Sequence, residues 1–164
     1  MTRNCFKLTL IISIIWFSLY SCINEEQKAI RQSAEIDSVR TAIHNSIAWA
    51  GKKDFNLLYR IIANDSNYLE VDPGLKIIRG FEQFKNMEQV WRSADFKAVR
   101  YDIRELKITF SERGDVSWFY CILDDVSEWK KQQVSWINTR WTGVLEKRKG
   151  KWVIVQMHFS FAQK

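Results

Sequence analysis

SWINTRWTGVLEKRKGKWVIVQMHFSF, residues 135–161, is the stretch that decides the fold. Two long runs rich in β-branched and aromatic residues flank a short charged segment, residues 146–150, which ends in glycine. Such a pattern predicts two antiparallel strands joined by a tight turn. In the second run, large apolar side chains occupy both the odd and the even positions. A strand that is apolar on both faces needs a cover on each side. We therefore expect helices on one face and a second subunit on the other.

The same hairpin resembles a known family. Residues 139–144 (TRWTGV), 150–154 (GKWVI) and 158–160 (HFS) are similar, in residue type and spacing, to the closing hairpin of the SnoaL-like branch of the nuclear-transport-factor-2-like superfamily. The association domain of calcium/calmodulin-dependent protein kinase is similar over the same hairpin. More weakly, the resemblance extends over residues 36–161. It implies an α+β fold, a cone-shaped cystatin-like roll in which three N-terminal helices pack on a curved antiparallel sheet.

Periodicity along the rest of the chain predicts the same order of elements. Apolar residues at helical spacing predict helices over residues 33–50 and 80–93, with a shorter helix after Asp54 and Gly51 as the C-terminal cap of the first. A short strand over residues 68–71 precedes a turn at residues 72–74. From residue 99 the period becomes two, and its phase slips at Arg104 and Glu105, which predicts a β-bulge. We expect residues 124–133 to form a polar loop before the final hairpin.

The N-terminus is typical of an exported protein. Arg3 and Lys7 precede an apolar run over residues 8–20, which is too short to span a bilayer, and small residues follow. The ending LYSC resembles a bacterial lipobox, in which Cys22 would carry the lipid. We therefore expect a signal peptide at residues 1–22, a polar tether at 23–32 and the domain at 33–164, anchored by lipid in the bacterial cell envelope. A plain secretory signal or an uncleaved anchor is the alternative.

Composition argues against several function classes. Without the signal peptide, Cys121 and Cys22 are the remaining cysteines, and the chain has two histidines, so we expect no disulfide, no metal cluster and no cofactor. The formal net charge is +6, but acidic and basic residues are interleaved. The densest basic run, residues 147–151, lies on the predicted hairpin turn, so we expect no nucleic-acid partner. No phosphate-binding loop and no nucleophile-elbow motif occurs.

Aromatic density predicts a ligand cavity. Eight tryptophans in 164 residues favour flat apolar walls, suited to a ring-containing or lipid-like ligand. Arg140 lies in mid-strand, four positions from Trp136 and from Val144, which regular alternation places on the same face. An arginine among apolar neighbours needs an anion. Two partners stay open for it: the carboxylate of a ligand, or an internal salt bridge to Asp124 or Glu70.

The resemblance adds a second line of argument for this cavity. Arg140 corresponds by position to an arginine that lines the pocket in the kinase association domains. Phe159 stands where the family uses a further arginine, which favours an amphipathic ligand over a strongly anionic one. The predicted ligand-binding residues are Arg140, Trp118, Tyr120, Trp91, Trp49, Tyr68 and Phe159.

Asp124 is the candidate general base if the domain is an enzyme. Related cyclases and isomerases of the superfamily use an acid in an apolar pocket with a tyrosine as hydrogen-bond donor, and Tyr120 or Tyr101 would supply it here. The non-functional alternative is that Asp124 and Asp125 are solvated acidic residues of a loop. Three functions stay open: a non-catalytic binding domain, which the sequence favours, an isomerase, cyclase or dehydratase, and a structural domain with a filled cavity.

Assembly is predicted from the second apolar face of the last strand. Trp152, Ile154 and His158 share that face if the strand alternates regularly. A two-fold pairing of sheets is the commonest way to cover such a face. We therefore expect a homodimer, with a small amphipathic or carboxylate-bearing ligand and the membrane as the other partners.

Overall fold

The computed structural model of the chain describes the backbone of residues 3–162 and the side chains of residues 27, 28 and 30–162. The chain forms two compact units, residues 1–37 and 38–164, and each is described by itself. Helix α1 (Arg3–Lys52) makes up the first unit and continues into the second. It includes residues 23–32, which we predicted to be a tether. The predicted lipid site, Cys22, lies outside the described side chains. No helix in the described part of the chain is long and apolar enough to cross a membrane.

Three short helices follow α1. They are α2 (Phe55–Ile61), α3 (Phe81–Lys85) and α4 (Glu88–Arg92), so the helix predicted over residues 80–93 is divided in two. The carboxylate of Asp54 accepts a hydrogen bond from the backbone N–H of Leu57 at 2.9 Å, which confirms the predicted cap of α2. The C-terminal cap of α1 lies later than predicted: Gly51 is helical, and Lys53 adopts the left-handed conformation (φ 51°).

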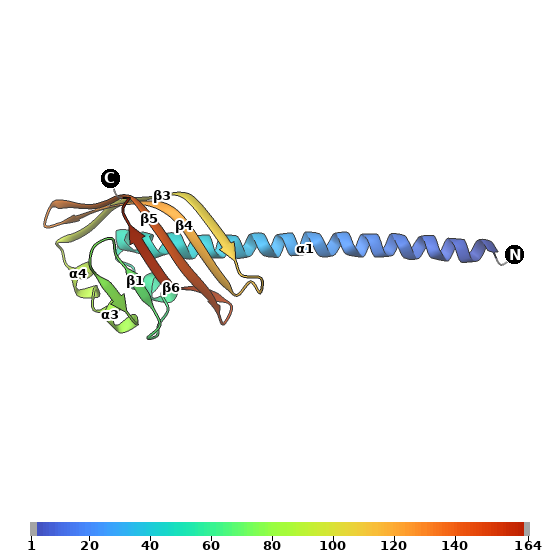
Figure 1. Ribbon diagram of the computed structural model, residues 1–164, viewed down its shortest axis with the longest axis horizontal. Coiled ribbons are helices and arrows are strands. Elements are labelled where there is room, and N and C mark those ends of the chain that lie inside the picture. Colours follow the sequence, from blue (N-terminus) through green and yellow to red (C-terminus); the bar gives the residue numbers. More distant parts are fainter. Residues whose placement is uncertain (1–2, 163–164) are drawn as a thin grey trace. The chain divides into compact units, whose positions relative to one another are not determined.

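Six strands form one sheet in the order β2-β1-β6-β5-β4-β3. The strands are β1 (Leu69–Val71), β2 (Ile77–Arg79), β3 (Phe96–Phe110), β4 (Val116–Trp129), β5 (Gln132–Arg148) and β6 (Lys151–Ser160). Neighbours are antiparallel except β1 and β6, which are parallel. In Figure 1 the long strands β3–β6 curve across the end of α1 that belongs to the second unit. The predicted α+β roll, with helices packed on a curved sheet, is confirmed, and β2 is an addition to it.

Strands β4 and β5 are longer than the sequence indicated. The polar loop expected over residues 124–133 is wrong, because both strands run through it to a tight turn at Lys130 and Lys131, whose φ angles are 52° and 65°. Asp125 therefore lies inside a strand. The bulge predicted in β3 is confirmed, since Glu105 has φ 54° and the register against β4 shifts at this point.

A second bulge, in β5, decides which side chains face the helices. The register between β4 and β5 shifts beside Asn138, which has φ 53°. Alternation changes phase at a bulge, because one strand carries an extra residue. Trp136 and Thr139 therefore both face the helices, and Arg140 faces the opposite side. The prediction that Trp136 and Arg140 share a face is wrong for this reason.

A third bulge, in β6, corrects the prediction about the dimer face. The register against β5 shifts so that one extra residue lies in β6 between Ile154 and Gln156. Trp152 and Ile154 before the bulge, and Met157 and Phe159 after it, are all buried in the core, whereas His158 is exposed. The largest apolar side chains of β6 thus all lie on its core face. The predicted dimer surface of Trp152, Ile154 and His158 is wrong.

The core fills the space between the helices and the inner face of the sheet. Trp141 is fully buried; its ring stacks on Phe159 at 5.4 Å between centroids and meets the Phe119 ring edge-on at 4.9 Å. Gly143 follows on the same face of β5. A Cβ at this position would come within 2.5 Å of the Phe119 ring and 2.8 Å of the Gln156 carbonyl oxygen. Close packing therefore requires glycine here.

Candidate active site

A pocket of about 300 Å³ lies between the helices and the sheet of the second unit. Its aromatic lining consists of Trp49, Phe84, Trp91, Phe96, Trp136 and Phe159. Its polar lining consists of Ser46, Glu70, Asp72, Lys76, Asp125 and Ser127. The volume is at the small end of the range for ligand sites, and mostly apolar walls with a few polar groups are typical of them. The pocket therefore fits a small ring-containing molecule.

The aromatic walls are built from side chains in mutual contact. Trp91 meets Trp49 at 5.0 Å and Phe84 at 5.2 Å between ring centroids, both edge-on, and Trp136 meets Phe159 at 5.1 Å. Edge-on pairs hold one another in place, since the positive edge of one ring meets the negative face of the other. Trp49, Trp91 and Phe159 thus line the cavity as we predicted from the sequence. Their contact with a ligand stays a prediction.

Asp125 carries one of the three carboxyl groups that line the pocket, and it is partly buried. It follows Phe119, Cys121 and Leu123 at every second position of β4, and these three side chains face the core. Burial raises the pKa of the Asp125 carboxyl, and a hydrogen bond with Ser127 opposes the rise. A carboxyl group with a raised pKa can hold or release a proton closer to neutral pH than one in water.

Glu70 carries the second carboxyl group. The hydroxyl of Tyr68 donates a hydrogen bond to its Oε2 at 2.7 Å, and Tyr68 itself is only 1% exposed. Burial raises the pKa of Glu70; the bond from Tyr68 and the charge of Lys76 lower it, and the charge of Asp72 raises it. Burial also raises the pKa of Tyr68, so its hydroxyl remains a donor. Tyr68, predicted as a wall of the cavity, instead holds Glu70 in position.

The two carboxyl groups stand at different parts of the pocket. Glu70 lies on β1 and Asp125 on β4, and β6 and β5 lie between these strands. Three strand spacings of about 4.8 Å place the two strands on the order of 14 Å apart along the sheet. Neither carboxyl group is a cause of the pKa shift of the other, so the two do not act as a dyad that shares one proton. Both line the same pocket.

Three residues predicted to line the cavity face away from it. Arg140 is exposed and donates a hydrogen bond from Nη2 to the carbonyl oxygen of Phe161 at 2.6 Å. Trp118 is 47% exposed and Tyr120 37% exposed. The cause is the choice of which alternate positions of β4 and β5 face the helices. We made that choice by placing Arg140 inward, and the structure shows the opposite choice. The argument for a ligand carboxylate at Arg140 falls with this placement.

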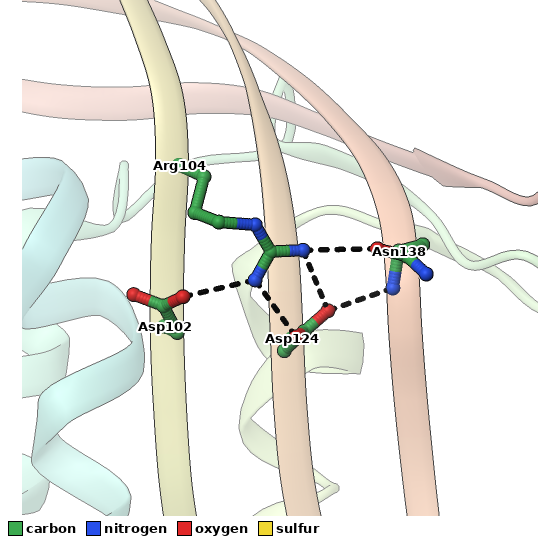
Figure 2. Close-up of polar contacts among 4 residues, drawn as sticks. All are labelled: Asp102, Arg104, Asp124 and Asn138. Atoms are coloured by element: carbon green, nitrogen blue, oxygen red, sulfur yellow. Dashed lines mark hydrogen bonds and ion pairs between the residues drawn. The ribbon is translucent and has the colours of Figure 1, made fainter.

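Asp124, the predicted general base, also lies on the outer face of the sheet. Its carboxylate accepts two hydrogen bonds from Arg104, at 2.8 and 3.1 Å, and one from the backbone N–H of Asn138 at 2.7 Å. Arg104 also bonds Asp102 at 2.9 Å and the side-chain oxygen of Asn138 at 2.9 Å (Figure 2). Arg104, and then the Asn138 N–H, lower the pKa of Asp124 to about 2. A carboxylate held ionised in this way is unsuited to proton transfer near neutral pH, and Asp124 instead links the bulges of β3 and β5.

Sequence reasoning missed the polar groups that do line the pocket. Asp125 was assigned to a loop, although its odd-numbered place after Phe119 and Cys121 was a usable signal once the strand was known to continue. No local signal marked Glu70, which depends on the pairing of β1 with β6. Among the described side chains, no group of three or more His, Cys, Asp or Glu residues is placed to hold a metal ion.

Comparison with known proteins agrees with this architecture. Residues 39–164 match the profile of the SnoaL-like domain. A candidate dehydratase of the nuclear-transport-factor-2-like family from Streptomyces avermitilis superimposes with a TM-score of 0.69 at 14% identity, over 81% of this chain and 99% of that one. No curated protein matches the chain.

Two further solved structures share the fold. A candidate calcium/calmodulin-dependent kinase II association domain from Exiguobacterium sibiricum has a TM-score of 0.65 at 8% identity, over 80% of this chain and 95% of that one. A nuclear-transport-factor-2-like protein with a cystatin-like fold from Novosphingobium aromaticivorans has a TM-score of 0.64 at 14% identity, over 82% and 86%. At these identities the likeness carries the fold alone.

Proposed function

Because the chain belongs to the family of SnoaL-like domains, we propose that its pocket catalyses proton transfer on a small ring-containing molecule, with Asp125 as the base. One observation carries the proposal: a carboxyl group whose pKa is raised by burial faces an aromatic-walled pocket. A raised pKa brings a carboxylate closer to the operating pH, where general-base catalysis is most effective. Isomerisation and dehydration are the reaction types that fit.

The roles follow from the contacts of each group. Asp125 takes a proton from a carbon of the substrate, and its carboxyl group becomes neutral. In an isomerisation the same proton returns to a second carbon. In a dehydration it passes to the leaving hydroxyl group, which departs as water. Glu70, fixed by the hydroxyl of Tyr68, holds the far end of the molecule so that the reacting carbon stays beside Asp125.

The structure removes the main support for a binding-only role, which the sequence favoured. That hypothesis rested on Arg140 inside the cavity, and Arg140 is exposed on the other face. A pocket with partly buried carboxyl groups and no lining arginine among the described residues fits acid–base chemistry better.

Hydrogen–deuterium exchange tests the proposal without knowledge of the natural substrate. A panel of small cyclic ketones and β-hydroxy ketones, with and without amino substituents, is incubated with the protein in D₂O and followed by NMR. The wild type should accelerate exchange next to the carbonyl group for some panel members, and Asp125→Asn should lower that rate by about 10²–10⁴-fold. Asp102→Asn, which changes an exposed carboxylate bonded to Arg104 on the outer face, is the matched control. Equal rates for wild type and Asp125→Asn, or no exchange with any panel member, would contradict the proposal.

We also propose that the protein is exported and anchored by lipid at Cys22. The support is the order of basic start, apolar run and LYSC ending in residues 1–22. Metabolic labelling with a fatty-acid analogue in a bacterial host should mark the wild type and not Cys22→Ala. Equal labelling of both, or of neither, would refute it.

Assembly as a homodimer stays a prediction, and the surface that supports it is now the outer face of the sheet. Trp118 and Tyr120 on β4 present partly exposed aromatic rings there. We propose that a second copy covers them, because aromatic side chains are enriched in interfaces. Light scattering at micromolar concentration should give twice the chain mass for the wild type and a lower mass for Trp118→Glu. A monomeric wild type would rule the dimer out.

A further inference from the structure

We propose that the pocket selects an organic cation, a ring-containing molecule with an ammonium group that is held at the Glu70 end. This inference rests on the proposed function of the pocket and adds the charge class of its ligand. It concerns the part of the lining formed by β1, the β1–β2 turn and helices α3 and α4.

The charges of the lining are the first reason. Among the described residues that line the pocket, three carry carboxyl groups, namely Glu70, Asp72 and Asp125, and one, Lys76, carries an ammonium group. An anionic ligand would approach three like charges in a partly desolvated site, which costs free energy. A cationic ligand would instead balance the charge of a lining in which carboxyl groups outnumber ammonium groups by three to one.

The aromatic side chains next to Glu70 are the second reason. The ring of Tyr68, whose hydroxyl bonds Glu70, meets Phe84 at 5.1 Å. Phe84 meets Trp91 at 5.2 Å, and Trp91 meets Trp49 at 5.0 Å. Ring faces attract cations, and aromatic walls combined with a carboxylate are the usual chemistry by which proteins bind organic ammonium groups. A simple metal cation would gain little from such walls, so the ring-containing ammonium fits both features.

Lys76 is the third reason, because the carboxyl group of Glu70 already responds to its positive charge. Its charge lowers the pKa of Glu70, after the larger effect of the Tyr68 bond. Lys76 itself is exposed, and its ammonium group contacts the sulfur of Met87, which gives it no counter-charge. An exposed lysine on a flexible stem can move aside for a ligand. A ligand ammonium beside Glu70 would therefore be repelled by the charge of Lys76, and it would gain affinity when that charge moves away or is removed.

The test compares three small probes of similar shape and different charge. They are benzyltrimethylammonium, its uncharged carbon isostere neopentylbenzene, and phenylacetate. Binding to the full chain is followed by tryptophan fluorescence, since Trp49, Trp91 and Trp136 line the pocket, and by calorimetry. The cation should bind at least about tenfold more tightly than its isostere, and phenylacetate should bind most weakly.

Variants assign the preference to Glu70. Glu70→Gln should reduce the ratio of cation to isostere to less than about threefold and leave the affinity for neopentylbenzene unchanged. Glu82→Gln, which alters an exposed glutamate of α3 outside the lining, is the matched control. Lys76→Met should strengthen cation binding, and it serves as the deciding variant if near-ultraviolet circular dichroism shows that Glu70→Gln does not fold.

Several results would overturn the inference. They are equal binding of cation and isostere by the wild type, tightest binding of phenylacetate, binding of none of the probes at millimolar concentration, an unchanged ratio in a folded Glu70→Gln, or unchanged cation affinity in Lys76→Met. These measurements report binding alone. Deuterium exchange of neutral ketones without a cation preference would therefore overturn this inference and leave the proposed function intact. A cation preference without Asp125-dependent exchange would do the reverse.

Discussion

Replacement of Asp124 by asparagine should destabilise the domain at the bulge of β5. The carboxylate accepts the backbone N–H of Asn138, whose positive φ turns it out of the regular ladder, and it pairs with the guanidinium of Arg104. The substituted amide side chain would keep one neutral acceptor oxygen and lose the charge. The Asp124 side chain is only 14% exposed, so its bond to the N–H is shielded from water. Hydrogen bonds to charged groups contribute about 1.5–3 kcal/mol, and we expect a loss of unfolding free energy in that range.

The other members of the Asp124 network, Asp102 and Arg104, provide control variants for this prediction. Asp102 is 52% exposed and contacts Arg104 alone within the network, so Asp102→Asn should change the free energy of unfolding by less than about 1 kcal/mol. Arg104→Met removes the ion pair and keeps the bond from Asn138 to Asp124. It should therefore destabilise the domain less than a change that removes the carboxylate itself.

The dependence on pH gives a second readout. The folded-state pKa of Asp124, about 2, lies below the ordinary value of 3.8. The stabilisation is therefore fully present above about pH 4 and is lost as the pH falls through 2. The difference between wild type and Asp124→Asn should be constant near neutral pH and shrink from about pH 4 towards about pH 2.

Urea unfolding followed by tryptophan fluorescence at a series of pH values measures both effects. The reasoning is refuted if Asp124→Asn is no less stable than Asp102→Asn at neutral pH. It is also refuted if the difference from the wild type persists undiminished at about pH 2. At that pH the Asp124 carboxyl group would be half protonated in the folded state and almost fully protonated in the unfolded state, so most of the stabilisation should be lost.

The remaining predictions concern packing and the outer face. Gly143→Ala should lower the free energy of unfolding in urea by about 1–3 kcal/mol, because its Cβ would meet the Phe119 ring and a backbone oxygen. Gly51→Ala, at a helical position with nothing within 4 Å, should raise it by up to about 1 kcal/mol. Equal behaviour of the two variants would contradict the packing described for Gly143. Ile154→Asp should abolish cooperative unfolding, since Ile154 is fully buried; a folded monomer would place it at a subunit contact instead. Arg140→Met should leave both the unfolding midpoint and probe binding the same as in the wild type within experimental error, because Arg140 is exposed. A loss of probe binding would show instead that Arg140 lines the pocket.

Much of the fold was predictable because its signals are local. Helical spacing placed α1 and α2, and the carboxylate of Asp54 caps α2 through a residue three positions away. The bulge at Glu105 was visible because apolar residues on both sides of it fall on opposite parities. The closing hairpin was enough to indicate the family, which the match over residues 39–164 shows.

The site was not predictable in the same way, because it depends on pairing between distant strands. The bulges of β5 and β6 each insert one residue where both parities carry apolar side chains, so the sequence does not reveal the change of phase. For this reason Trp152 and Ile154, which lie in the core, were assigned to the same face as the exposed His158. Trp136 faces the pocket and Arg140 faces outward, because the bulge of β5 lies between them. Glu70 and Asp125 face one pocket because β1 adds to β6 and β4 continues past the expected loop. Local pattern thus determines which elements form, and only tertiary pairing determines which carboxyl groups they bring to the cavity.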